Sequence, residues 1–277
     1  MASIFSYEGK RVAIVGCFSG MGEACARALV DLGAEVHGAD IKPSPVDLAS
    51  FTQVDLKDWS SIDQAVGGIG GEIDALFNCA GLPQTFPAAD VVAVNFLGIR
   101  HWTEQWLPRV KRGGAIATIS SLAGMAYLTK LEMLKPVIAI ADRVAFLDWV
   151  AGNPGLVGDG YSFSKELLNT WTCLQAVELA PRGIRINATM PSPTQTPMMA
   201  AFEQVAGQVV LDTFTAPTGR RSTADEQGNA MVLLNSDAAS FVSGVCLPVD
   251  GGFFGGVTTG AIDMQALLAR ATASAAV

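Results

Sequence analysis

The predicted architecture follows from residues 11–40, which read RVAIVGCFSGMGEACARALVDLGAEVHGAD. Val12 to Val15 is a short apolar run typical of a buried strand, and Ala24 to Leu32 carries apolar residues at helical spacing. Glu35 to Ala39 has the character of a strand again. This order predicts a βαβ unit at the start of an α/β protein.

The loop between the first strand and the helix has a G-x-x-x-G-x-G pattern made by Gly16, Gly20 and Gly22. Glycines at such a place allow a tight turn and a close approach of the backbone to a pyrophosphate, whose charge the helix N-terminus meets. A single glycine loop can also be only a turn. Its position between a strand and a helix favours nucleotide binding.

Asp40 ends the second strand at the distance expected of an acid that binds ribose hydroxyls. Its carboxylate would repel a 2′-phosphate, and Ile41 stands where an arginine could receive one. These residues favour NAD over NADP, although Lys42 keeps NADP open as the alternative.

Composition narrows the class of protein. The chain has 277 residues, of which 50% are apolar and 16% charged, and this suits a compact enzyme with a large core. A formal charge of −8 disfavours nucleic acid as a partner. Without a leader at the first residues or an apolar run long enough for a bilayer, we expect a cytoplasmic protein and no membrane contact.

Cysteine and histidine usage argues against metal and hydrolase chemistry. Five cysteines, odd in number and without a Cys-x-x-Cys pair, suggest reduced thiols and no zinc site. His37 and His101, the two histidines, lie in a predicted strand and a predicted helix and are expected to be structural. A zinc alcohol dehydrogenase or a Ser-His-Asp hydrolase would need histidine beside other chemical groups.

The sequence YSFSK at residues 161–165 carries the candidate chemistry. On a helix, Tyr161 and Lys165 would share one face. A fixed ammonium nearby would favour the phenolate, lower the tyrosine pKa and let the phenol exchange a proton with an alcohol or a carbonyl. The alternative is a surface helix with an amphipathic tyrosine, and this pair alone does not decide between the two.

Together, the glycine loop, Asn-Cys-Ala-Gly at residues 78–81 and the pair Tyr161 and Lys165 resemble the short-chain dehydrogenase/reductase family, over residues 9–252 and in the family's order. The resemblance implies a Rossmann-type, doubly wound parallel sheet with helices on both faces. We expect one NAD(P)-binding domain over residues 1–277 with a helical insert.

The resemblance also implies roles for four residues. Tyr161 would exchange the proton, and Ser121, rather than Ser120, would bind the substrate oxygen. Lys165 would lower the tyrosine pKa and hold the nicotinamide ribose, and Asn95 would hold a water near it. An equal alternative for Asn95 is an amide that supports a helix kink.

The resemblance also gives the expected cofactor contacts. One position departs from the family pattern: Ser192 follows Pro191 where the family usually has glycine, so glycine's conformational freedom is missing there. The expected contacts are Gly16, Ser19, Gly20, Met21, Gly22, Asp40, Ile41, Asp55, Leu56, Cys79, Ala80, Gly81, Tyr161, Lys165, Pro191, Ser192, Thr194 and Thr196.

Thirty-nine residues separate Ser121 from Tyr161, more than the family usually has. Residues 125–158 alternate apolar and charged side chains as amphipathic helices do, apart from Pro136. This insert, with Leu-Pro-Gln-Thr at 82–85, resembles the bacterial 3α-hydroxysteroid dehydrogenase/carbonyl reductase branch. Its apolar face needs the protein's own core, another subunit or a substrate, and packing or subunit contact is favoured over substrate contact.

The closing third predicts a last strand from Ser240 to Val249. Before it, Met198, Met199 and Phe202 either line an apolar substrate pocket or belong to the core. The C-terminal extension, residues 253–277, covers either the mouth of the pocket or a neighbouring subunit.

We therefore expect an NAD-dependent oxidoreductase that interconverts a secondary alcohol and a ketone on an apolar cyclic or aromatic substrate, with a hydroxysteroid as the leading specific candidate. Few charges lie in the substrate-facing segments, and this disfavours sugar phosphates. A small-ketone carbonyl reductase or an aryl-alcohol dehydrogenase is the alternative. A non-catalytic dinucleotide sensor is disfavoured by the complete set of four residues. We expect a homo-oligomer, a dimer or a tetramer.

Overall fold

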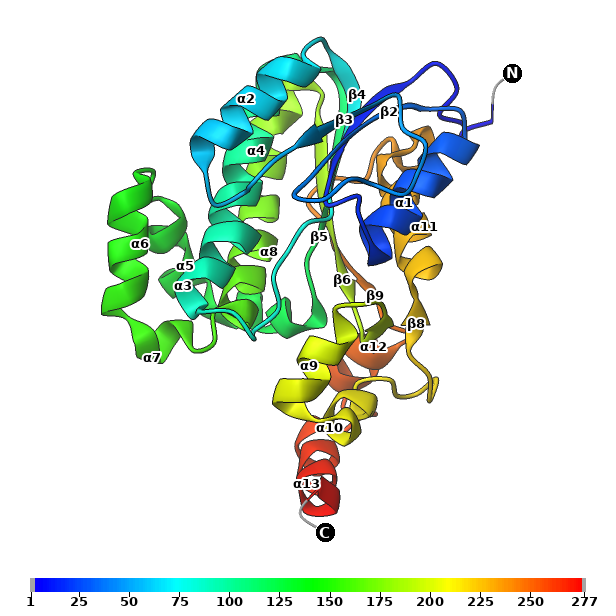
Figure 1. The fold of residues 1–277 in the computed structure, drawn as a ribbon. Coiled ribbons are helices and arrows are strands. Elements are labelled where there is room, and N and C mark those ends of the chain that lie inside the picture. Colours follow the sequence, from blue (N-terminus) through cyan, green and yellow to red (C-terminus); the bar gives the residue numbers. More distant parts are fainter. Residues whose placement is uncertain (1–2, 276–277) are drawn as a thin grey trace.

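A parallel sheet of seven strands forms the centre of the protein in a computed structural model that describes residues 3–275, with side chains described for residues 3–269 (Figure 1). The strand order is β3-β2-β1-β4-β5-β6-β9, and each neighbouring pair is parallel. The strands are β1 Arg11–Val15, β2 Glu35–Asp40, β3 Ser50–Gln53, β4 Ile73–Asn78, β5 Val110–Ile119, β6 Arg185–Pro191 and β9 Cys246–Val249. The chain order reverses between β1 and β4, so a ligand crevice is expected at their carboxyl ends.

Helices cover both faces of the sheet, as predicted (Figure 1). One face carries α1 Gly20–Asp31 and α11 Ala224–Asn235, and the other carries α2 Trp59–Ile69, α4 Ile99–Trp106 and α8 Tyr161–Leu179. Strand β1 shows why both faces close: Val12 and Ile14 pack into one buried cluster, whereas Ala13 and Val15 pack into the other. A strand that is apolar on both sides needs such double cover.

The insert folds as helices that pack on the protein's own core. It contains the 3₁₀ segment Leu122–Lys130, α5 Leu131–Ile138, α6 Arg143–Gly152 and α7 Pro154–Val157. Phe146 is fully buried, with its ring 5.6 Å from that of Phe96, and Trp149 stacks on Phe163 of α8 at 5.9 Å. The predicted apolar face therefore lies against the helices that carry Asn95 and Tyr161.

The last strand is shorter than predicted. β9 begins at Cys246, not at Ser240, because residues 237–239 form a 3₁₀ turn and the chain then bends through Gly244, which has a φ of +80°. The Gly244 amide donates to the carbonyl of Ile186, and this contact brings the chain into register beside β6. The apolar pattern of residues 240–245 does not encode this bend.

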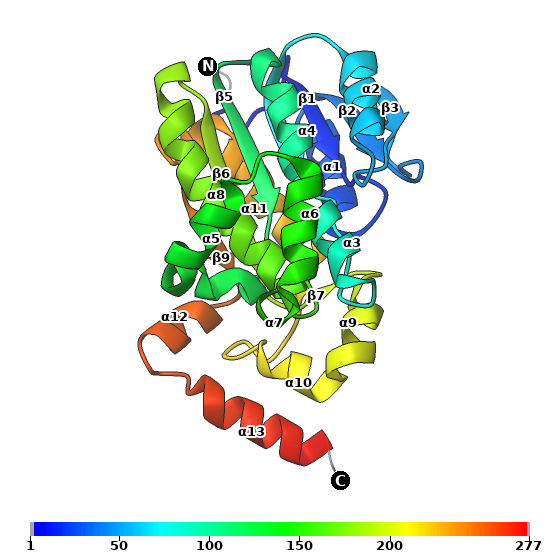
Figure 2. The same cartoon turned by 90° about the vertical axis from the view of Figure 1, so that its left-hand side faces the viewer.

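Beyond the carboxyl ends of the strands lies a group of short helices (Figure 2). They are α9 Met199–Ala206, α10 Gln208–Thr213, α12 Phe253–Thr258 and α13 Met264–Ala275. The segment that holds α9 and α10 leaves the body at β7 Thr194–Gln195 and returns at β8 Ser222–Thr223, which pairs with β7. We call residues 196–221 the lid segment.

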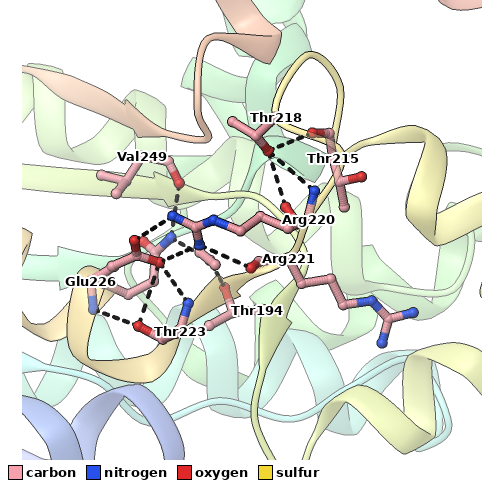
Figure 3. Close-up of polar contacts among 10 residues, drawn as sticks. Thr194, Thr215, Thr218, Arg220, Arg221, Thr223, Glu226 and Val249 are labelled. Atoms are coloured by element: carbon pink, nitrogen blue, oxygen red, sulfur yellow. Dashed lines mark hydrogen bonds and ion pairs between the residues drawn. The ribbon is translucent and has the colours of Figure 1, made fainter.

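Charged contacts fix the return of the lid segment (Figure 3). Arg220 makes two hydrogen bonds of 2.7 and 2.9 Å with the carboxylate of Glu226, which with Thr223 also forms the N-terminal capping box of α11. The side chain of Arg221 points away from this cluster and bonds Glu203 at 2.6 Å and Asp212 at 2.8 Å. The Arg220–Glu226 ion pair thus joins the lid to the body, whereas the ion pairs of Arg221 lie within the lid.

Within residues 3–275, no helix combines the length and the apolar character needed to cross a membrane. The same part of the chain holds no cluster of three or more His, Cys, Asp or Glu side chains suited to a metal ion.

Candidate active site

A cavity of about 540 Å³ opens at the carboxyl ends of β1, β2 and β4. The glycine loop makes it possible, because Gly16 has a φ of +88° and a Cβ on it would lie 2.3 Å from the amide nitrogen of Ala80. A Cβ on Gly22 would lie 1.8 Å from the carbonyl oxygen of Gly16. The loop after β1 therefore crosses the end of β4 at a distance that only glycine permits.

Asp40 lies at the wall of this cavity, as the sequence predicts. Its carboxylate accepts hydrogen bonds from the backbone amides of Phe18 at 3.0 Å and Lys42 at 3.2 Å. The Lys42 ammonium lies 5.2 Å from the centre of the Phe18 ring. The Asp40 carboxylate is thus held at the end of β2 by hydrogen bonds from the glycine loop and from the loop that follows β2.

Most of the predicted cofactor residues line one of two adjoining cavities. The first cavity is bordered by Gly16, Ser19, Asp40, Ile41, Asp55, Leu56, Cys79, Ala80 and Gly81. The second is bordered by Met21, Tyr161, Pro191, Ser192, Thr194 and Thr196. Gly20 and Gly22 shape the loop without lining either cavity, and Lys165 lies behind Tyr161. Phe18, Phe86 and Asp90 also line the first cavity and were not predicted, since no pattern marks them.

The second cavity, of about 420 Å³, is largely apolar. Met198 borders both cavities, and Met199 and Phe202 border the second, so the structure supports the pocket interpretation of these residues over the core one. The Phe202 ring lies edge-on to that of Tyr161 at 5.0 Å. Met264 and Leu268 of α13 also line it, which places part of the C-terminal extension over the pocket.

Tyr161 begins α8 and faces this second cavity. The preceding Gly160 has a φ of +80°, and a Cβ on it would lie 2.5 Å from the carbonyl oxygen of Ala88, so the chain enters the helix through a glycine-only turn. One turn further along, the Lys165 ammonium lies 5.6 Å from the centre of the Tyr161 ring and donates to the carbonyl of Ile119 at 3.0 Å. The expected helical pair is therefore present.

The structure distinguishes the two serines that follow β5. Ser121 lines the second cavity with Tyr161 and lowers the pKa of its phenol, and the Ser121 hydroxyl accepts from the amide of Ala123 at 3.1 Å. Ser120 is buried and donates to the carbonyl of Lys165 at 3.3 Å. Ser121 is thus the serine beside the phenol, in the register that the resemblance implies.

Asn95 lies in a π-helical turn, Ala93–Gly98, and is fully buried. Its side-chain oxygen accepts from the amide of Leu82 at 2.6 Å, and its nitrogen donates to the Leu82 carbonyl at 3.0 Å. Both groups of the amide thus hold the chain that leaves β4. These contacts support a structural role, and the water-holding role remains a prediction.

Burial is the largest cause of the pKa shifts of both Tyr161 and Lys165. Desolvation at the pocket wall raises the pKa of Tyr161 to about 12, against a lowering by the Ser121 hydrogen bond and a further rise caused by Asp159. Burial lowers the pKa of Lys165 to about 8. The expected lowering of the tyrosine pKa by Lys165 is not seen in this structure, because burial of the phenol outweighs the other contributions and Lys165 is not among them.

Ser192 does not need the freedom of glycine. Every described non-glycine residue, Ser192 included, has a negative φ, so the backbone at this position is unstrained. Ser192 is buried, and its amide donates to the Val249 carbonyl at 3.4 Å. The departure from the family pattern therefore leaves the strand end intact.

This combination of a glycine-loop cavity and a Ser-Tyr-Lys site defines a nicotinamide-dependent oxidoreductase fold, and comparison with known proteins agrees. The family model described as short chain dehydrogenase matches residues 10–133, and the one described as Enoyl-(Acyl carrier protein) reductase matches residues 148–254. The residues between the two matches, 134–147, fall within the insert. The chain belongs to the short-chain dehydrogenase/reductase family, whose known members here act on alcohols and ketones.

Two curated relatives resemble nearly the whole chain. Coniferyl-alcohol dehydrogenase of Pseudomonas sp. is 32% identical over 244 residues, 88% of this chain and 96% of the relative. The 3-alpha-hydroxysteroid dehydrogenase/carbonyl reductase of Comamonas testosteroni is 30% identical over 248 residues, 87% of this chain and 95% of the relative. The crystal structure of the 3-alpha-hydroxysteroid dehydrogenase from Pseudomonas sp. B-0831, complexed with NADH, superposes with a TM-score of 0.78 at 28% identity, covering 91% of this chain and all of that one.

Proposed function

We propose that this protein is an NAD-dependent dehydrogenase that interconverts a secondary alcohol and a ketone on an apolar cyclic or aromatic substrate. The observation that carries the proposal is that Ser121 and Tyr161 line the same apolar cavity, which adjoins the glycine-loop cavity, and that the Ser121 side chain lowers the pKa of the phenol. A substrate oxygen placed between these two hydroxyls would have its carbon turned toward the cofactor side.

The residues at the site fit a nicotinamide dinucleotide. The loop of Gly16, Gly20 and Gly22 would receive the pyrophosphate at the start of α1, and Asp40 the adenosine ribose. Pro191 and Thr196, which line the second cavity, would border the nicotinamide. When bound, the dinucleotide supplies the redox chemistry by accepting or giving a hydride.

The protein's own groups manage the proton and the geometry. In oxidation the Tyr161 phenolate oxygen takes the hydroxyl proton, and in reduction the phenol returns it to the carbonyl oxygen. The Ser121 hydroxyl donates a hydrogen bond to that oxygen and stabilises the charge that develops on it. Burial raises the pKa of Tyr161, and this favours the protonated phenol that reduction needs.

NAD is favoured over NADP because the Asp40 carboxylate is fixed at the cavity wall by two backbone amides. A 2′-phosphate bound there would meet that charge. The Lys42 side chain lies over Phe18, so this lysine supports the NADP alternative less than its position in the sequence suggests. The NADH complex of the similar hydroxysteroid dehydrogenase supports the same choice.

The pocket supports both an aryl alcohol and a hydroxysteroid. Methionine side chains at positions 21, 125, 198, 199 and 264 line it, and unbranched thioether chains adapt to flat rings of different size. The curated relatives carry the names of one substrate of each kind, coniferyl alcohol and a 3α-hydroxysteroid. The hydroxysteroid remains the leading specific proposal, with the aryl alcohol as the second candidate.

We further propose a homo-oligomer in the cytoplasm, where the five free cysteines would stay reduced. In the family the usual dimer surface is built from the helices that carry Asn95 and Tyr161. Here the insert packs on these helices, so the assembly would use another surface. Sedimentation of the wild-type protein would give the subunit number.

A substrate panel tests the proposed function. Reduction of a 3-ketosteroid, an aryl ketone and a small aliphatic ketone would be followed with NADH and with NADPH, and oxidation of 3α-hydroxysteroids and coniferyl alcohol with both oxidised cofactors. We expect turnover of at least one ring-containing substrate and a higher kcat/KM with NADH. Cofactor binding without turnover of any alcohol or ketone would support the dinucleotide sensor instead.

A further inference from the structure

We infer that Asp159 makes the substrate pocket select neutral and cationic substrates against anionic ones. The inference rests on the proposed function and adds to it a specificity-determining residue and a charge class. Asp159 lies in the loop between the insert and α8, two residues before Tyr161, and it lines the second cavity beside Gln84 and Tyr161.

The Asp159 carboxylate is held in place. One of its oxygens accepts a hydrogen bond from the backbone amide of Tyr161 at 3.0 Å, at the N-terminus of α8. The residue remains exposed, so its other acceptor positions are free to face the cavity. Its charge reaches the reaction site, because it raises the pKa of the Tyr161 phenol.

No positive side chain lines the second cavity among residues 3–269, whose side chains the structure describes. The nearest catalytic cation, Lys165, is buried behind the Tyr161 ring and donates to the Ile119 carbonyl. On the lid segment, Arg221 is matched by two carboxylates, Glu203 and Asp212. The fixed charge in the pocket wall is therefore negative.

A carboxylate or sulfonate on a substrate would enter this apolar pocket without a cation to pair with and with Asp159 opposing it. Burying an unpaired charge is costly, and a like charge in the same pocket wall adds to the cost. Rejection of a substrate class by such a repulsive element is a general route to specificity. A neutral ring alcohol meets no such cost, and an ammonium group would gain an attraction.

Three ketones of one shape separate these charges: 4-acetylbenzamide, 4-acetylbenzoate and 4-(aminomethyl)acetophenone. For the wild-type enzyme with NADH we expect kcat/KM for the amide to exceed that for the benzoate by roughly tenfold or more, as a like charge in a partly exposed site predicts. In Asp159→Asn this ratio should fall severalfold, to what the burial of an unpaired carboxylate alone leaves, and the advantage of the ammonium compound should disappear.

The matched control is Asp142→Asn. Asp142 caps α6 by accepting from the Ala145 amide at 2.8 Å, and Asp159 likewise accepts from a backbone amide at the start of a helix, that of Tyr161, although Gly160 is the N-cap of α8. Asparagine can keep either hydrogen bond, because its side-chain oxygen is also an acceptor. A merely structural role of Asp159 would lower kcat/KM for all three ketones together, and Asp142→Asn should leave the ratios unchanged.

The inference is overturned if wild-type kcat/KM for the benzoate equals that for the amide, or if Asp159→Asn leaves the ratio within twofold of wild type. If the wild-type enzyme turns over none of the three ketones, the proposed function is contradicted instead. Calorimetric Kd values for the amide and the benzoate then test the inference. It requires the benzoate to bind more weakly than the amide to the wild-type protein, and this difference to shrink in Asp159→Asn.

Discussion

Replacing Lys130 with methionine should destabilise the protein through the helix that carries the catalytic pair. The Lys130 ammonium bonds the carboxylate of Glu166 at 2.6 Å, and this ion pair joins the insert to α8 one residue after Lys165. The Glu166 side chain is only 3% exposed, whereas that of Lys130 is 44% exposed. The substitution therefore leaves a buried carboxylate without its partner.

The expected cost follows from these exposures. Breaking a fully buried pair typically costs about 3–5 kcal/mol, because an uncompensated charge remains in the core. Water reaches the lysine side of this pair and screens it, so we expect a lower cost of about 2 kcal/mol. For a domain of this size that corresponds to a fall in Tm of roughly 4–8 °C.

Thermal unfolding followed by circular dichroism measures this change, with two further variants for comparison. Lys135→Met removes the 3.7 Å contact with Glu132, whose side chain is 98% exposed, and should shift Tm very little. The double variant Lys130→Met with Glu166→Met removes both charges and should regain most of the loss. A Tm for Lys130→Met equal to that of Lys135→Met would refute the reasoning.

Three other results are expected. In Gly16→Ala the new Cβ would lie 2.3 Å from the amide nitrogen of Ala80, so NADH binding measured by fluorescence titration should weaken at least tenfold. Gly255→Ala, with open space around the new Cβ, should bind NADH as the wild type does. Equal NADH binding by the two variants would contradict the account of the glycine loop. Cys173 should react with iodoacetamide before Cys79 near neutral pH. Hydrogen bonds from Cys246 and Tyr127 lower the pKa of Cys173 to about 7, whereas contact with Cys25 and burial raise the pKa of Cys79. Earlier labelling of Cys79 than of Cys173 in mass spectrometry would contradict these contacts. Because the folded pKa of Lys165 is lowered to about 8 from about 10.5, the unfolded chain binds more protons between these values, so stability of the cofactor-free protein should rise with pH from about 8 to 10, and Lys165→Met should lose that rise in urea unfolding.

Much of this arrangement could be predicted from the sequence because it depends on local pattern. The apolar run before Gly16 and the acid at Asp40 determine a βαβ unit whatever lies elsewhere, and Tyr161 and Lys165 share a helix face by spacing alone. The resemblance then favoured Ser121 over Ser120. The structure supports this register, because Ser121 lowers the pKa of the phenol whereas the Ser120 hydroxyl donates to the carbonyl of Lys165.

The features that were missed depend on contacts between distant segments. The start of β9 is set by a bend at Gly244 that meets β6, and the pKa of Tyr161 is raised mainly by desolvation; residue spacing records neither. Asp159 gives no signal in the sequence, because it looks like an ordinary loop acid until the insert folds and places it at the pocket. Pocket walls built from several elements need the fold.

The phenol of Tyr161 is the group on which the proposed reaction depends, so Tyr161→Phe is the most direct measurement. With the best substrate of the panel, kcat should fall by about two to four orders of magnitude, the range for a lost general acid–base, while the NADH Kd and the Tm stay near those of wild type. A variant that binds NADH normally and keeps near-native kcat would contradict the assignment of proton transfer to this residue.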